Sequence, residues 1–284
     1  MEHHQVDQAD SSSLLPGGVQ YSADELYLGV QSCSRPDEEH ARNSLPKAIA
    51  AKEALKKINA DIQLEALIQD ATWENIEALC KENQVIVDGT DNFETRFLIN
   101  DVAFKNNIPW IYGACVGSYG VALTFQPALT LCFQCLFDRS PEVGKMATCD
   151  TAGIVSPIVH GVAAYQVAHT LKILVGEKFE SRLLQLDSWR NSWRTIGVSQ
   201  ARNPNCSCCA ELKFRYLEGR EKSHLTQLCG RNAVQVSPRR KTDINFRVLS
   251  QRLGKSTKVK FNDYIMRIQI NGLEITLFSD GRSI

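Results

Sequence analysis

The sequence lacks three features that would each point to a particular class of protein. It has no excess of either charge, with 32 basic and 32 acidic side chains among 284 residues, so it carries no electrostatic signature of nucleic-acid binding. No apolar run approaches the roughly 18–20 residues that a membrane-spanning helix needs. The first residues include no apolar core of a secretory signal, which predicts a cytoplasmic protein.

The composition is that of a globular protein with an unusual number of cysteines. Hydrophobic residues make up 43% of the chain, enough to bury the core of one or two domains. Residues 1–40 are mostly polar, with a serine run and no usable periodicity, and are predicted to be a disordered or non-native tail. Four of the 10 cysteines form two close pairs, which favours metal binding or chemistry over disulfides.

Residues 84–117 predict a β-α-β unit. The apolar run 85–87 ends in a small polar turn, which is typical of a buried parallel strand. Asn92 is then a suitable N-cap for a helix, and the apolar run 108–112 predicts the second strand. In open α/β sheets, ligands bind at the carboxyl ends of such strands.

Two aspartates, Asp88 and Asp91, follow the first of these strands. A carboxylate beside a helix N-terminus can hold a metal ion that bridges phosphates. The alternative is that Asp91 and Asn92 only cap the helix. Spacing alone leaves both uses open.

Upstream of this unit, the pattern predicts a helix from Lys47 onward with Ser44 as its cap, a strand over residues 64–68 and a helix over residues 73–80. Lys47 stands at the helix start, where backbone N–H groups point outward and a phosphate could bind. A solvated lysine is the other interpretation.

Two C-x-x-C motifs lie far apart in the chain. They consist of Cys132 with Cys135 and of Cys206 with Cys209. Four thiolates suit a tetrahedral Zn²⁺ with no open position, so the spacing predicts a structural zinc site that joins remote segments. A redox pair or reduced core cysteines are the alternatives, and Cys208 is predicted to be a spare thiol.

A polar loop that contains Cys149 precedes a densely apolar segment, residues 154–174. This density predicts a buried helix. A helix N-terminus raises the thiolate fraction of a nearby cysteine, which makes Cys149 a candidate nucleophile; an unreactive buried cysteine is the alternative. His160 and His169, within the helix, are predicted to be packing or surface residues.

The C-terminal part predicts a small α+β module. Residues 182–196 and 233–236 read as strands, residues 244–253 as a helix, and residues 265–278 as a hairpin with Asn-Gly at its turn. The expected organisation is therefore the tail 1–40, a main domain over 41–228 and this module over 229–284.

Four motifs in this order resemble the ThiF/MoeB/HesA adenylyltransferases, relatives of the ubiquitin-activating enzymes. The motifs are Asp88-x-Thr90-Asp91-Asn92-x-x-Thr95-Arg96-x-x-x-Asn100, Cys132-x-x-Cys135, Cys149-x-x-x-Gly153-x-x-x-Pro157 and Cys206-x-x-Cys209. The resemblance covers most of the chain. It implies an α/β fold with a Rossmann-like doubly wound sheet.

The resemblance also implies a function. Such proteins use ATP and Mg²⁺ to adenylate the C-terminal Gly-Gly carboxylate of a ubiquitin-like sulfur carrier of the ThiS or MoaD type, for thiamin or molybdopterin biosynthesis. The catalytic, metal-holding aspartate of the family falls on Asp91, its phosphate-contacting lysine on Lys47 and its carrier-linked cysteine on Cys149. A separate sulfurtransferase and a homodimer are further expectations.

One element of the family is missing from the sequence. No G-x-G-x-x-G turn, which lets a backbone approach nucleotide phosphates, occurs before Lys47. We therefore expect a truncated or divergent member whose sheet lacks its first β-α-β element and which binds ATP weakly or not at all. The alternative function is a non-catalytic, zinc-stapled module that binds the carrier.

Overall fold

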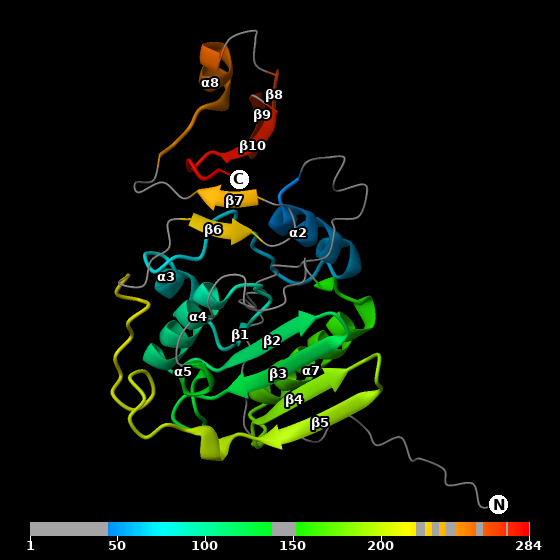
Figure 1. The fold of residues 1–284 in the computed structure, drawn as a ribbon, viewed down its shortest axis with the longest axis vertical. Coiled ribbons are helices and arrows are strands. Elements are labelled where there is room, and N and C mark those ends of the chain that lie inside the picture. Colours follow the sequence, from blue (N-terminus) through cyan, green and yellow to red (C-terminus); the bar gives the residue numbers. More distant parts are fainter. Residues whose placement is uncertain are drawn as a thin grey trace, which may run out of the picture.

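The computed structural model describes residues 45–137, 152–219, 225–228, 233–236, 242–253, 258–270 and 272–283 (Figure 1). The helices are α2 (Lys47–Ile58), α3 (Ile76–Cys80), α4 (Phe93–Lys105), α5 (Phe133–Leu136), α7 (Ser156–Leu174) and α8 (Phe246–Leu253), with a 3-10 turn at Ser199–Ala201. The strands are β1 (Ile86–Val87), β2 (Trp110–Val116), β3 (Tyr119–Phe125), β4 (Arg182–Asp187), β5 (Ser192–Gly197), β6 (Leu225–Leu228), β7 (Ala233–Val236), β8 (Lys258–Phe261), β9 (Ile265–Ile270) and β10 (Leu273–Phe278). Among these helices, none has the length and apolar character to cross a membrane.

The main sheet has five strands in the order β1-β2-β3-β4-β5. Strands β1 and β2 are parallel and are joined through α4, with Ile86 opposite Trp110, so the predicted β-α-β unit is confirmed. The other neighbours pair antiparallel. The result is a mixed, Rossmann-like α/β sheet, as expected. The loss of a first β-α-β element stays a prediction.

Side chains divide between the two faces of the sheet because successive strand residues point to opposite sides. On one face, Trp110, Leu123 and Phe125 pack with Phe97 of α4 in an aromatic-rich core. On the other face, Ala122 and its neighbours on β4 pack against α7 in a second apolar cluster. The sheet is thus covered by a different helix on each side.

Helix α4 begins as its sequence predicts. The Asn92 side chain accepts a hydrogen bond from the backbone N–H of Thr95 at 2.8 Å, which satisfies one of the unpaired donors of the first turn. The helix ends at Lys105, and Asn107 just beyond adopts a left-handed conformation with φ of 55°. Most of α4 is buried, so it is a fixed reference for the loop that precedes it.

Two upstream predictions need correction. Residues 64–68 were expected to form a strand, but this segment has no regular secondary structure and pairs with no strand among the described residues. A strand exists only where a neighbour pairs with its backbone. The helix expected over residues 73–80 is shorter and begins at Ile76. Helix α2 forms as predicted with Pro46 at its N-cap position, whereas Ser44 lies outside the described residues.

Helix α7 forms over the predicted range but is not buried all round. Its inner stripe of Ile158, Val162, Gln166 and Thr170 packs on the sheet. A parallel stripe remains exposed, with exposed fractions of 42% for Val159, 57% for Val167 and 57% for Leu171. The apolar density of the segment predicted the helix correctly, but the prediction that it is buried all round was wrong. Within the described part of the chain, only one face of α7 is covered.

The C-terminal elements confirm the predicted α+β character. Strands β8, β9 and β10 form an antiparallel sheet, and Phe246 of α8 packs on it with Met266 and Ile268. Figure 1 shows these elements at the end of the molecule farthest from β5, beyond the β6–β7 pair. Arg282 bonds to Asp70 at 2.8 Å and so ties this region to the main domain. The limits 1–40, 41–228 and 229–284 stay predictions, and the tail lies outside the described residues.

Candidate functional site

The candidate site lies at the carboxyl end of β1, where the chain turns into α4. Asp88 is the first residue after the strand, and its side chain is fully buried. One carboxylate oxygen, Oδ1, accepts hydrogen bonds from the backbone N–H of Thr90 at 2.8 Å and from its hydroxyl at 2.7 Å. The other oxygen, Oδ2, accepts from Nε of Arg96 at 3.2 Å. Asp88 therefore fixes the conformation of the loop at Thr90 from a buried position.

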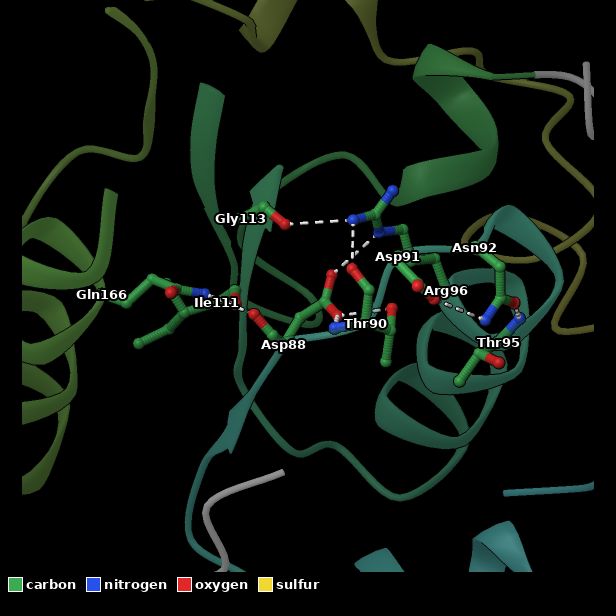
Figure 2. A network of polar contacts seen from close by, with 9 residues as sticks. All are labelled: Asp88, Thr90, Asp91, Asn92, Thr95, Arg96, Ile111, Gly113 and Gln166. Atoms are coloured by element: carbon green, nitrogen blue, oxygen red, sulfur yellow. Dashed lines mark hydrogen bonds and ion pairs between the residues drawn. The ribbon is translucent and has the colours of Figure 1, made fainter. Parts of the chain in front are cut away.

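Arg96, one turn into α4, completes this network (Figure 2). Its Nη2 donates to the carbonyls of Thr90 and of Gly113 on β2, so one guanidinium ties the loop to two strands. The guanidinium also lies 5.1 Å from the centre of the Tyr112 ring. Burial alone would lower the pKa of Arg96, but Asp88 beside it raises the pKa above its ordinary value, so the group is a permanent cation.

Asp91 has a different environment from Asp88. It is exposed, and it stands directly before the N-cap of α4, with its Oδ1 at 3.5 Å from Nδ2 of Asn92. A carboxylate in this position can meet a cation at the strand exit, next to backbone N–H groups that favour anionic phosphates. Of the two aspartates that the sequence singled out, Asp91 is thus the candidate ligand. Asp88 is a buried support.

Lys47 is exposed and opens α2. In the view of Figure 1, α2 lies beyond the end of the main sheet toward which β2 runs. That Lys47 contacts the same phosphates as Asp91 stays a prediction. Cys149 lies outside the described residues, so its predicted place ahead of α7 is likewise untested.

Gln166 is a site residue that the sequence reasoning missed. From the inner stripe of α7, its Nε2 donates to the carbonyls of Asp88 at 2.7 Å and of Ile111 at 3.0 Å (Figure 2). These bonds join the helix to the residue after β1 and to the neighbouring strand β2. A side chain at position 113 would place its Cβ 2.7 Å from Nε2 of Gln166, so any residue other than glycine would force Gln166 to move. The available signal was a long polar side chain within the mainly apolar inner stripe of a helix.

His160 and His169 are placed as predicted. His160 is exposed on α7. His169 is half-buried, stacks on Tyr165 and shares a hydrogen bond with the hydroxyl of Thr124 at 2.9 Å. His160 is thus a surface residue and His169 a packing residue.

The four predicted metal ligands do come together. The sulfurs of Cys132, Cys135, Cys206 and Cys209, named here the cysteine cluster, all lie within 4.8 Å of one another. The Sγ–Sγ distances are 3.8 Å for Cys132–Cys135, 3.4 Å for Cys132–Cys206 and 3.5 Å for Cys135–Cys209. A tetrahedral zinc site with Zn–S bonds of about 2.3 Å has sulfurs about 3.8 Å apart. The donor set and its spacing therefore fit a metal ion such as zinc.

Three of the four thiols of the cysteine cluster are poor acids in this environment. Burial raises the pKa of Cys206 to about 11. The hydrogen bond to Cys208 and burial raise the pKa of Cys132 above its ordinary value as well. Burial alone would also raise the pKa of the fourth, Cys135, but hydrogen bonds from the backbone of Asn203 and of Cys132 lower it below its ordinary value. Bringing such groups together as thiolates requires a compensating cation, because a buried charge without a partner is unfavourable.

The chain is similar to one family of proteins and to several known proteins. The model of the ThiF family matches residues 37–208. The sulfur carrier protein ThiS adenylyltransferase of Bacillus subtilis (strain 168) is 39% identical over 266 residues, which cover 92% of this chain and 79% of that protein. The SAMP-activating enzyme E1 of Haloferax volcanii is 33% identical over 168 residues, 58% of this chain and 61% of that protein. The crystal structure of E. coli MccB with ATP aligns with a TM-score of 0.48 and 18% identity, over 58% of this chain and 51% of that one.

Proposed function

The chain belongs to the ThiF family, and from that premise we propose that it adenylates the C-terminal carboxylate of a ubiquitin-like sulfur carrier of the ThiS or MoaD type. The observation that carries this proposal is the strand exit of β1, where an exposed Asp91 stands before the N-terminus of α4 on a loop fixed by buried Asp88 and Arg96. The B. subtilis relative that matches 92% of the chain bears the name of this activity.

In the proposed reaction, a carboxylate oxygen of the carrier attacks the α-phosphorus of ATP. A P–O bond to the carrier forms, the bond to the β-phosphate breaks, and pyrophosphate leaves with the electron pair. Mg²⁺, when bound, would neutralise charge on the phosphates. Asp91 would hold that ion, and Lys47 would contact the phosphates directly. Asp88 and Arg96 would contact neither the ion nor the phosphates. They bond to Thr90 and so hold the neighbouring Asp91 in position.

The cysteine cluster would hold Zn²⁺ in a structural role. Cys132, Cys135, Cys206 and Cys209 would supply four ligands, the number that a structural zinc site has, and would leave no position for a substrate. Cys149 would form the link to the carrier during sulfur transfer, with sulfur supplied by a separate sulfurtransferase. The homodimer implied by the family resemblance and the cytoplasmic location predicted from the sequence also remain proposals.

One observation favours a second function, that of a non-catalytic module that binds the carrier. Within the described residues no strand pairs with the outer edge of β1, and residues 64–68 do not supply one. The sequence also lacks the G-x-G-x-x-G turn that would approach the nucleotide. A chain without these nucleotide-binding elements could still bind the carrier but would not use ATP.

An exchange assay separates the two functions. Carrier-dependent exchange of pyrophosphate into ATP, measured with a ThiS-type and a MoaD-type carrier, is expected from an adenylyltransferase. Asp91→Asn should lower that exchange about 100-fold or more, since it removes a charge that acts on the phosphates. Asp61→Asn, at an exposed aspartate of the same chain, is the matched control.

The same preparation gives the decisive negative result. If no exchange occurs with either carrier while a carrier still binds in calorimetry, adenylation is refuted and the second function, non-catalytic carrier binding, takes its place. Undiminished exchange in the Asp91→Asn variant would remove Asp91 from the proposed mechanism. The carrier that supports exchange also assigns the thiamin or the molybdopterin pathway.

A further inference from the structure

Two adjacent polar residues of α4, Asn100 and Asp101, are completely buried. Asparagine and aspartate are unfavourable in the middle of a helix, and burying an aspartate costs more than burying an amide. Desolvation by burial raises the pKa of Asp101 to about 6. The mechanism proposed above uses neither residue, so their burial needs another explanation.

Asn100 bonds to both of the loops that carry the cysteine cluster. Its Oδ1 accepts a hydrogen bond from the backbone N–H of Phe133 at 2.8 Å, directly after Cys132. Its Nδ2 donates to Sγ of Cys208 at 3.2 Å, between Cys206 and Cys209 in the chain. A single side chain therefore spans two segments that are remote from each other in the sequence.

Asp101 and two further side chains make a second connection. Oδ1 of Asp101 accepts from Nε2 of Gln134 at 2.8 Å, and Oδ2 accepts from the backbone N–H of Tyr216 at 2.9 Å. The carbonyl oxygen of Gln134, Oε1, accepts from the hydroxyl of Ser207 at 3.0 Å. Gln134 and Ser207 each lie inside one C-x-x-C loop, so the two loops are bonded to each other as well as to α4.

From these contacts we propose that Asn100 and Asp101, with Gln134 and Ser207, are positioning residues for the metal site of the cysteine cluster. They hold the two C-x-x-C loops at the separation that a tetrahedral ion requires before the ion binds. Groups that orient metal ligands in this way typically change metal affinity 10–100-fold when they are removed. The proposal rests on the zinc site proposed above and extends it to residues that touch no ion.

The test measures Zn²⁺ affinity by competition with a chromophoric chelator, on the full chain purified without metal. Asn100→Leu removes the amide at similar volume and should weaken Zn²⁺ binding 10–100-fold. Asn83→Leu is the matched control, because Asn83 is also a buried asparagine but its amide bonds only to the carbonyl of Leu79 in its own turn. The Zn²⁺ affinity of the Asn83→Leu variant should stay within about twofold of that of the unmodified chain.

A second variant and a second measurement cover the case in which Asn100→Leu does not fold. Ser207→Ala deletes one hydroxyl from the loop-to-loop bond and should weaken Zn²⁺ binding by several-fold. Both variants should also shift the absorption bands of the Co²⁺-substituted protein, which report ligand geometry and not overall stability.

The outcomes are distinguishable. Equal Zn²⁺ affinity in Asn100→Leu, Ser207→Ala and Asn83→Leu, with unchanged Co²⁺ spectra, would overturn the positioning role and leave the zinc site standing. Failure of the unmodified chain to bind Zn²⁺ would overturn the zinc site itself, and the positioning role with it.

Discussion

The ion pair between Asp88 and Arg96 offers a direct test of how the strand exit is held. Substituting Arg96→Met removes the guanidinium and leaves the Asp88 carboxylate, whose side chain is 0% exposed, without its cation. It also leaves the carbonyls of Thr90 and Gly113 without the donor that now serves both. Breaking a buried pair from one side typically costs about 3–5 kcal/mol. We expect a loss of that size in the free energy of unfolding.

The assay is urea denaturation followed by circular dichroism, with Asp88→Asn and the double variant completing a cycle. If the two residues act as a pair, the double variant should be about 1–3 kcal/mol more stable than the sum of the single losses predicts. Arg182→Met is the control, because Arg182 pairs with Glu180 at the surface and should cost less than about 1 kcal/mol. A loss below about 1 kcal/mol for Arg96→Met, or strict additivity in the cycle, would refute the reasoning.

Two further predictions concern α7 and its contacts. Gly113→Ala would set a Cβ 2.7 Å from Nε2 of Gln166, so it should lower the free energy of unfolding by about 1–3 kcal/mol in urea titrations; a neutral effect would mean that the helix can shift away. Burial, with Lys172 as a lesser cause, lowers the pKa of His169 from 6.5 to about 4, so the stability linked to its neutral ring is present above pH 6.5 and is lost as the pH falls toward 4. His169→Gln should therefore reduce the fall in the free energy of unfolding between pH 6.5 and pH 4 by about 1 kcal/mol, once partial exposure of the ring is allowed for. Urea titrations at several pH values measure this, and parallel profiles for the two proteins would contradict it.

The parts of the fold that depend on local chemistry could be predicted from the sequence. The apolar run before Asp88 and the cap at Asn92 act within a few residues, and the structure has β1 and α4 where they indicate. The segment 64–68 has the same apolar character as β1, yet it forms no strand because no neighbour pairs with it. Strand formation is a property of two segments, and one segment cannot reveal its partner.

The candidate site shows the same limit. Asp88 and Asp91 are three residues apart and chemically identical in the sequence, but only tertiary contacts separate them into a buried support and an exposed candidate ligand. Arg96 could be singled out as a motif residue, whereas its bond to the Gly113 carbonyl depends on how β2 is placed. The cysteine pairs were predictable because C-x-x-C spacing constrains ligand geometry directly.

The length of α4 ties two functions to one rigid body. Its first turn carries Arg96 and follows Asp91, while its middle carries Asn100 and Asp101. A hydrogen-bonded helix that is buried along most of its length moves as a unit. If the cysteine segments moved apart, the displacement would be transmitted along the helix axis to the loop that carries Asp91. Loss of an ion that never meets the substrate would then appear as a kinetic defect.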